Sequence, residues 1–412
     1  MRLLIARHSA LLGTMCKVIE LGKIFILTII AGRLLSTEDF GIFSLLLSVA
    51  AIVAILAEFR VQDVIYRNIN KGGGVSEAVG SSVVIVIFFA AIGHILLISI
   101  SNLNFFYGSN SNFYYLYGFV FYLSISRVFK TVLMAEERSV LILYIEIVSF
   151  VVGALTLLYF YCNQGISINS IIVVRILDLF ILTAMTSAAV LTRSGIKMPS
   201  KYQVISLVKE AFPLVLSGVA VILYQKVDQL MIKDVMGYDA LGLYSANLTI
   251  VTIFSILPMM YAQVASKSIH VDCGNLNLIR YLRIISYSGL LLSVFLFVLG
   301  GYLVTYIFGT RYQIDSAIWY PLALIPFFIS TGAGATQILI AENRQSFVWI
   351  KSLIALLVNI LLNYFLIPLY GMFGAAAATA FALFVGNIFS NYMIKSYRDI
   401  FKIQFKSLLF HW

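Results

Sequence analysis

Residues Val79–Ile100 read VGSSVVIVIFFAAIGHILLISI, and this run contains no Asp, Glu, Lys or Arg. About 20 apolar residues in a helix cross the hydrocarbon core of a bilayer. The apolar residues are continuous here and do not alternate with polar ones. Because backbone groups in lipid must be hydrogen-bonded within the protein, the run predicts a membrane-spanning helix.

The composition of the whole chain agrees with this segment. Hydrophobic residues make up 61% of the chain, charged residues make up 11%, and the mean hydropathy is +0.99. A soluble domain has about 45–50% apolar and about 25% charged residues. The three cysteines are far apart and the four histidines are scattered, so no zinc site, other metal site or disulfide is expected, and no cofactor is indicated. The composition therefore predicts an all-α integral membrane protein.

Runs like the first one recur along the chain and predict twelve transmembrane helices. Most connections between them are short, so consecutive helices are expected to pack antiparallel. The expected spans are Ala10–Leu35, Phe40–Phe59, Val79–Ile100, Phe113–Met134, Val140–Tyr161, Ile166–Thr192, Ala211–Met236, Ala240–Ala265, Ile284–Phe308, Ala317–Ala341, Phe347–Leu369 and Gly374–Lys395.

Basic residues gather in alternate connections. With these spans, 18 of the 28 Lys and Arg residues fall on one side of the membrane, whereas the other side has only Arg33, Lys233 and Arg311. Lys and Arg mark the cytoplasmic side, so both termini are expected inside. The net charge of +10 then faces anionic lipid headgroups, and no nucleic-acid partner is needed to explain it.

The basic loop between the sixth and seventh spans divides the chain into two halves. Glu38–Ser44 reads EDFGIFS and Asp239–Ser245, 201 residues later, reads DALGLYS. Since each half has an even number of spans, both copies have the same orientation, as in a parallel repeat about a pseudo-two-fold axis along the membrane normal. The expected domains are a six-helix lobe (1–192), a basic linker (193–210), a second six-helix lobe (211–396) and a basic cytoplasmic tail (397–412).

Three features of the sequence resemble the Wzx family of O-antigen flippases. They are the twelve spans, the repeated element, and the segment Asn359–Gly386, which reads NILLNYFLIPLYGMFGAAAATAFALFVG. Wzx proteins belong to the multidrug/oligosaccharidyl-lipid/polysaccharide (MOP) superfamily, with the lipid II flippases and the MATE antiporters. The resemblance implies a MATE-like V-shaped pair of lobes in a bacterial inner membrane. It implies alternating access, which moves an undecaprenyl-pyrophosphate-linked oligosaccharide from the cytoplasmic to the periplasmic leaflet. A polysaccharide polymerase and a chain-length regulator are the protein partners that it suggests.

Ionisable residues deep in the expected spans are the candidate site, because such residues are unfavourable in lipid and usually face a bundle interior. Lys and Arg suit a pyrophosphate, and Lys23 and Lys226 occupy similar positions in corresponding helices of the two halves. The acids are candidates for coupling to an ion. The cationic candidates are Lys23, Arg127, Arg175 and Lys226, and the acidic ones are Glu20, Asp178 and Asp228.

The same charges also have a structural interpretation. Glu20 and Lys23, and likewise Arg175 and Asp178, are three residues apart on one helix face and can pair locally. Lys351 and Glu58 lie near helix ends, where snorkelling explains them. Pro321 and Pro326 predict a kink in the tenth span, either static or a hinge.

Two other functional classes stay open at this point. A small-molecule or drug cation antiporter on the same fold would need an apolar pocket with one acid. A membrane enzyme, such as an O-antigen polymerase or a glycosyltransferase, would have a large outer loop or a carboxylate cluster, and neither is evident. The sequence therefore favours a flippase and not an enzyme.

Overall fold

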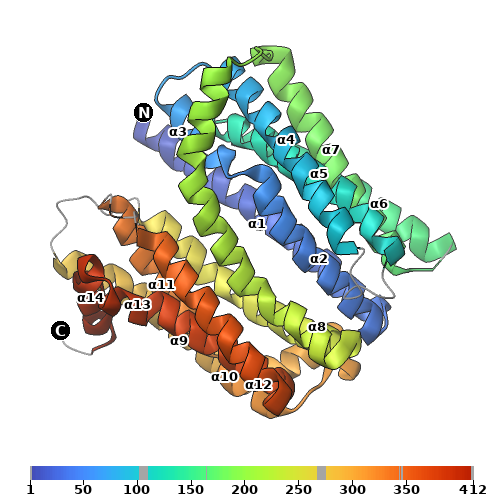
Figure 1. The fold of residues 1–412 in the computed structure, drawn as a ribbon, viewed down its shortest axis with the longest axis vertical. Helices are drawn as coiled ribbons and strands as arrows, with labels where there is room; N and C mark the ends of the chain where they lie inside the picture. The colour runs from blue at the N-terminus through green and yellow to red at the C-terminus, as the bar shows by residue number, and fades with distance from the viewer. Residues whose placement is uncertain are drawn as a thin grey trace. The chain divides into compact units, whose positions relative to one another are not determined.

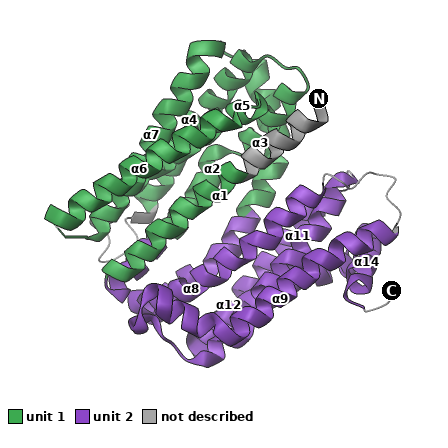
Figure 2. Cartoon of the chain, turned by 180° about the vertical axis from the view of Figure 1, so that it is seen from behind, with its two compact units in different colours: residues 1–35, 46–219 green, residues 36–45, 220–412 purple. Residues whose placement is uncertain are grey.

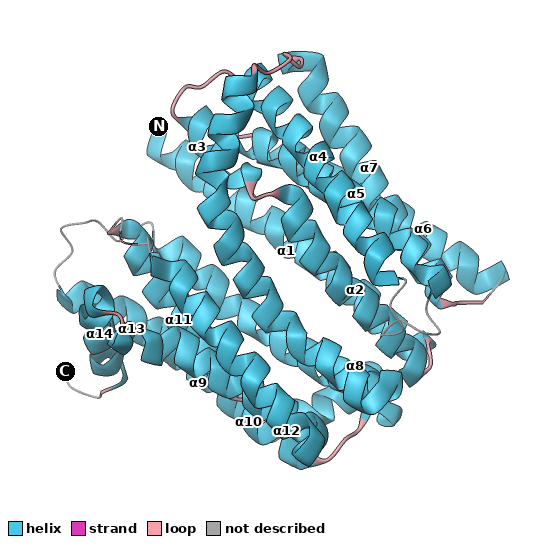
Figure 3. Ribbon diagram, in the orientation of Figure 1, coloured by secondary structure: helices cyan, strands magenta, loops and turns pink. Residues whose placement is uncertain are grey.

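The computed structural model of the chain describes residues 2–101, 110–163, 165–266, 275–342, 344 and 347–409. These residues are helical apart from short connections, and they include no strand (Figure 3). The helices form two compact units, which divide at Val219 inside one long helix (Figure 2). The ten residues Ser36–Leu45, which include the start of α2, belong with the C-terminal unit.

Unit 1 comprises Met1–Leu35 and Leu46–Val219. Within it α5 packs against α4 and α7, and α6 packs against α1 and α7. Its helices (Figure 1) are α1 (Arg2–Leu34), most of α2 (Thr37–Glu58), α3 (Val61–Asn70), α4 (Val75–Ser101), α5 (Asn110–Ala135), α6 (Ser139–Asn163), α7 (Ile168–Ser194) and the start of α8 (Lys201–Ala265). The second part of the segment expected as a linker, from Lys201 onward, is thus the first part of α8.

Unit 2 comprises Ser36–Leu45 and Ala220–Trp412. Within it α9 packs against α11 and α14, and α11 packs against α12. After α8 its helices are α9 (Asn275–Phe308), α10 (Trp319–Leu322), α11 (Ile325–Ala341), α12 (Val348–Phe384), a π-helix (Val385–Phe389), α13 (Ser390–Met393) and α14 (Arg398–Leu408).

Glycine breaks the two longest helices of the chain. α8 breaks at Gly237, with φ 87° and ψ −176°, and α12 breaks at Gly371, with φ 57° and ψ −137°. Positive φ is easily reached only by glycine. Nine of the described helices are long and apolar enough to span a membrane. Since two of these are broken and α1 adds a more charged span, the chain has the twelve transmembrane segments that the sequence predicts.

Apolar side chains remain exposed along these segments. Ile95, for example, is 62% exposed and Leu291 is 70% exposed. Large exposed apolar surfaces mark interaction with a partner or a membrane. Their distribution over long helices agrees with a multi-pass membrane protein.

Two short amphipathic helices occupy segments that the sequence analysis took as a loop and a tail. α3 buries Val61, Val64 and Ile65 on one face, which is the spacing of a helix lying on an apolar surface. α14 buries Ile400 and Ile403 in the same way. Such helices lie along a membrane or bundle surface and do not span it.

An arginine attaches α14 to the rest of unit 2. Arg344 Nη1 and Nη2 donate to the two carboxylate oxygens of Asp399 at 2.6 and 2.8 Å, and the Tyr397 hydroxyl donates to the Arg344 carbonyl at 2.6 Å. Burial raises the pKa of the Asp399 carboxyl, but the Arg344 guanidinium lowers it more, so the net pKa lies below its usual value. Paired arginine–carboxylate geometry of this kind is strong and directional.

The two copies of the repeated sequence element contact each other inside unit 2. A Cβ on Gly41 would collide with the Tyr238 carbonyl, and a Cβ on Gly242 would collide with the Thr37 carbonyl. Since both Gly41 and Gly242, and Thr37 and Tyr238, are separated by 201 residues, the contact is reciprocal. In a two-fold arrangement, each copy of an element makes the same contact with the other copy. The two copies of the sequence repeat therefore pack against each other in a two-fold manner.

The reciprocal contact predicts that Gly41→Ala and Gly242→Ala each destabilise the protein by about 1–3 kcal/mol, the usual range for overpacking. Gly22→Ala is the matched control, because a Cβ on Gly22 meets nothing within 4 Å. Thermal unfolding of the purified variants in detergent measures the effect. Equal melting temperatures for Gly41→Ala and Gly22→Ala would contradict the close contact.

Candidate functional site

Unit 1 contains a cluster of eight charged side chains from five helices. Four are acidic and four are basic, so the formal charges of the cluster cancel. Its members are Glu20 and Lys23 on α1, Glu58 on α2, Arg127 and Lys130 on α5, Glu146 on α6, and Arg175 and Asp178 on α7.

Lys23 lies at the centre of one half of this cluster. Its ammonium group is 2.6 Å from Glu146 Oε2, donates to Asp178 Oδ1 at 2.8 Å and donates to Ser149 Oγ at 2.8 Å. Arg175 pairs with the other oxygen of Asp178 at 2.5 Å. Lys23, Glu146 and Asp178 are all buried, so this ammonium group has exchanged its hydration for three protein partners. The local pair expected between Arg175 and Asp178 is present.

The other half of the cluster is centred on α5. Lys130 bridges Glu20 and Glu146, each at 2.6 Å. Glu20 thus pairs with Lys130, four helices away in sequence, and its expected local partner Lys23 pairs elsewhere. Arg127 Nη1 reaches both oxygens of Glu58 at 2.6 and 2.8 Å. The Glu58 side chain is fully buried while that of Arg127 is 42% exposed, so Arg127 is the most accessible cation of the cluster.

The space inside the cluster is very small. Glu20, Lys23, Arg127, Lys130 and Arg175 line a cavity of about 20 Å³, which is room for about one water molecule. A pyrophosphate does not fit in this arrangement. For these side chains to reach a phosphate, some of the ion pairs must first separate.

Asp228 is the buried acid of unit 2. It is 1% exposed, and one of its carboxylate oxygens accepts hydrogen bonds from the Tyr244 hydroxyl at 2.7 Å and from Thr379 Oγ1 at 3.2 Å. The other accepts from the backbone N–H of Gln229 at 2.8 Å. Three neutral donors surround Asp228, and no described cation forms an ion pair with it. A carboxylate in such a setting is suited to take up a proton or a small cation.

Lys226, two residues before Asp228 on α8, has a half-buried side chain. Among the described residues of unit 2, no carboxylate forms an ion pair with it. It therefore differs from Lys23, whose charge is neutralised by two acids. Lys226 belongs to unit 2, whereas the residues of the charged cluster belong to unit 1.

Glu146, Glu58 and Lys130 are the three members of the cluster that sequence reasoning missed as site residues. Glu146 interrupts an otherwise apolar span, LILYIEIVSF, and that interruption was a usable signal. Glu58 is close to a helix end, where snorkelling was the simpler explanation. It is nevertheless fully buried, and the turn that directly follows it has positive φ at Phe59 and Arg60.

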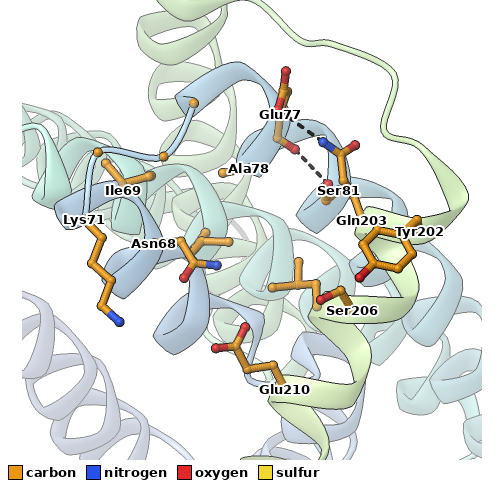
Figure 4. A pocket seen from close by; sticks show the side chains of 15 residues that line it. Asn68, Ile69, Lys71, Glu77, Ala78, Ser81, Tyr202, Gln203, Ser206 and Glu210 are labelled. Atoms are coloured by element: carbon orange, nitrogen blue, oxygen red, sulfur yellow. Dashed lines mark hydrogen bonds between the residues drawn. The ribbon is translucent and has the colours of Figure 1, made fainter.

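A separate pocket of about 560 Å³ lies where α3, α4 and α8 of unit 1 meet (Figure 4). Its lining carries both signs of charge, including Lys71, Glu77 and Glu210. Glu77 accepts from Gln203 Nε2 at 3.2 Å, as Figure 4 shows, and Glu210 pairs with Arg67. The two acids already have hydrogen-bond or ion-pair partners, and Lys71 adds a positive charge to the lining. The pocket therefore shows no preference for a positively or a negatively charged ligand.

Among the described residues, no group of three or more His, Cys, Asp or Glu side chains is arranged to hold a metal ion. The site is therefore described by its charges and its pockets.

Residues 7–267 match a protein family described as polysaccharide biosynthesis protein, and this stretch is more than half of the chain. The chain belongs to the polysaccharide biosynthesis protein family. A search of curated proteins found no match.

Solved structures share the fold of this polysaccharide biosynthesis protein at low sequence identity. An inward-facing multidrug resistance MATE family transporter of the MOP superfamily is 14% identical, with a TM-score of 0.71 over 94% of this chain and 96% of that one. The lipid II flippase MurJ in an inward closed conformation is 15% identical, with a TM-score of 0.64 over 96% and 91%. A MOP superfamily transporter from Pyrococcus furiosus is 14% identical, with a TM-score of 0.57 over 96% of each chain.

The ion pairs of this polysaccharide biosynthesis protein predict unequal effects of removing Arg175 and Asp178. Asp178→Asn leaves Arg175 without its carboxylate and should cost about 3–5 kcal/mol, as for other broken buried pairs. Arg175→Met should cost less, because Asp178 still pairs with Lys23, and the double variant should lie between the two. Thermal unfolding in detergent gives the order.

Lys71→Met, at an exposed lysine, is the control for losing one positive charge. If Arg175→Met proved as destabilising as Asp178→Asn, the second partner of Asp178 would have no energetic role.

Proposed function

We propose that this protein translocates a polyprenyl-pyrophosphate-linked oligosaccharide, of the O-antigen type, from the cytoplasmic to the periplasmic leaflet by alternating access. It binds and moves its substrate and catalyses no covalent chemistry. Membership of the polysaccharide biosynthesis protein family supports the polysaccharide. The fold shared with MATE transporters and with the lipid II flippase supports movement across a membrane. The observation that carries the proposal is Lys226, a half-buried lysine that forms no ion pair with any described carboxylate of unit 2.

An unpaired anion is strongly unfavourable at the low-dielectric centre of a membrane. A protein that moves a pyrophosphate across must therefore provide positive charge along its route. Lys226 interacts electrostatically with Asp228 but forms no ion pair with any described carboxylate of unit 2, so it can bind phosphate without first breaking an ion pair. This makes it the first substrate-binding residue in our proposal.

Lys23, Arg127 and Arg175 act in this proposal by exchanging partners. As the pyrophosphate arrives, its oxygens replace a carboxylate on one of these cations. Asp178, when released from Lys23 or Arg175, is then free to take up a proton, and Glu20 would be freed in the same way if a phosphate oxygen replaced it on Lys130. Asp228 is a third candidate for ion coupling, because neutral donors already surround it. Exchange of this kind links substrate binding to opening of the unit 1 cluster.

Lys226→Ala should abolish or greatly reduce translocation at normal protein abundance, whereas Lys226→Arg should keep part of the activity because it keeps the charge. The assay is complementation of a flippase-null strain, with surface polysaccharide measured beside the amount of protein in membranes. The same strain should be impaired by Lys23→Ala. Full export by the Lys23→Ala/Lys226→Ala double variant at wild-type abundance would remove both lysines from the mechanism.

The direction of transport depends on the orientation of the chain, and the distribution of basic residues supports both termini inside. Reporter fusions at Asn110 and Tyr370 should give an outside signal, and fusions at Lys71, Lys201 and Lys406 an inside signal. An inside signal at Asn110 would disprove the arrangement of spans proposed here.

A drug cation antiporter is the competing function, and Asp228 is the residue that favours it, because antiporters of that type need a buried acid. The two functions predict different effects of replacing Lys226. An antiporter should tolerate Lys226→Ala and fail with Asp228→Asn in a drug-resistance assay, while leaving surface polysaccharide unaffected.

A further inference from the structure

Lys351 is a buried lysine that pairs with no acid among the described residues of unit 2. It is the fourth residue of α12 and is 4% exposed. Its Nζ atom is buried and has no hydrogen-bond partner among the described residues. The sequence analysis explained this residue by snorkelling at a helix end, but a snorkelling ammonium group would reach solvent. A buried ammonium group without a partner is strongly unfavourable, so its retention calls for a ligand.

The side chain borders a pocket of about 290 Å³ that lies entirely within unit 2. This volume is close to the lower end of small-molecule sites, about 300 Å³. Besides Lys351 the lining includes a tyrosine ring, four carboxamides and many apolar side chains, and none of the described lining residues is a carboxylate. The lining residues that matter here are Tyr224, Gln225, Gln263, Gln337 and Asn387.

Irregular backbone and a glycine form part of the wall of this pocket. The π-helix Val385–Phe389 places Asn387 at the pocket wall, and single turns of π-helix are frequent at functional sites. Gln404 Nε2 of α14 donates to the Asn387 carbonyl at 3.1 Å, which satisfies a backbone acceptor there. A Cβ on Gly332, which also lines the pocket, would collide with the Asn387 side chain. The Asn387 side chain thus packs directly against Gly332 at the pocket wall.

The chemistry of the lining suggests one kind of ligand. Carboxamides donate and accept hydrogen bonds, as the hydroxyls of a sugar require, and the Tyr224 ring can pack on a sugar face. A single lysine balances one negative charge, whereas a pyrophosphate would leave charge uncompensated in this pocket. We propose that this pocket binds a sugar with one negative charge, a uronic acid, within the glycan of the translocated substrate. This inference rests on the proposed function and specifies its substrate class.

Binding can be measured on the full chain in nanodiscs, with the methyl glycosides of glucuronate and glucose as probes and inorganic phosphate as a third. Glucuronate should raise the melting temperature, and glucose should raise it much less. Lys351→Met should weaken glucuronate binding about 10- to 100-fold, as expected on loss of a hydrogen bond to a charged group. Without ligand, Lys351→Met should melt above wild type, because it removes an unpaired buried charge.

Lys402→Met, which changes an exposed lysine, is the matched control and should bind glucuronate as wild type does. Gln337→Leu offers a second test if the first variant is poorly expressed, and it should weaken both sugars. Equal binding of glucuronate to wild type and Lys351→Met would overturn the inference. Stronger stabilisation by phosphate than by glucuronate would overturn it too, since the pocket would then be a phosphate site. A lower melting temperature for ligand-free Lys351→Met would show that the lysine has a structural role instead.

Translocation assays separate this inference from the proposed function. Proteoliposomes are supplied with polyprenyl-linked glycans that differ only in carrying glucuronate or glucose. The wild type should favour the acidic glycan, and in Lys351→Met the ratio of the two rates should fall to about one. If the wild type moves both glycans equally, the pocket inference fails and the function stands. If it moves neither, the proposed function fails whatever the pocket binds.

Discussion

Neutralisation of charge inside an apolar helix bundle is the constraint on which most of this structure depends. In unit 1, five helices contribute four acids and four bases, and each of these side chains finds an opposite charge on another helix or on the next turn of its own. Breaking one such buried pair leaves a charge that lipid cannot solvate. The charges therefore fix which helices are neighbours, and the apolar side chains that face outward need only be compatible with the bilayer.

Unit 2 meets the same constraint in a different way. Its buried acid, Asp228, is held by neutral donors, and Lys226 and Lys351 have no ion-pair partner among the described residues of that unit. A closed set of ion pairs favours a stable resting arrangement, while an unpaired cation favours capture of an anion. The two units thus accommodate buried charge in different ways, even though their sequences share a repeated element.

The sequence predicts the features that are determined by residues close together along the chain. Twelve spans follow from hydropathy, and the breaks near Gly237 and Gly371 follow from backbone sterics. The pair Arg175–Asp178 follows from helical spacing. The partners of Glu20, Lys23 and Arg127 do not, because Glu20 meets Lys130 only once α1 and α5 are packed together. The pocket beside Lys351 likewise includes Gly386 and Asn387 of a π-helix that no sequence pattern predicted. The helices α3 and α14 are too short for a hydropathy signal.

The reciprocal contact of Gly41 and Gly242 limits how the gene can diverge. After an internal duplication, each copy can normally accumulate changes independently of the other. Here each glycine makes room for a carbonyl of the opposite copy, so a larger residue in either copy damages the same contact. Selection should therefore act on the two codons together. Both positions should remain glycine after the surrounding positions of the two copies have diverged.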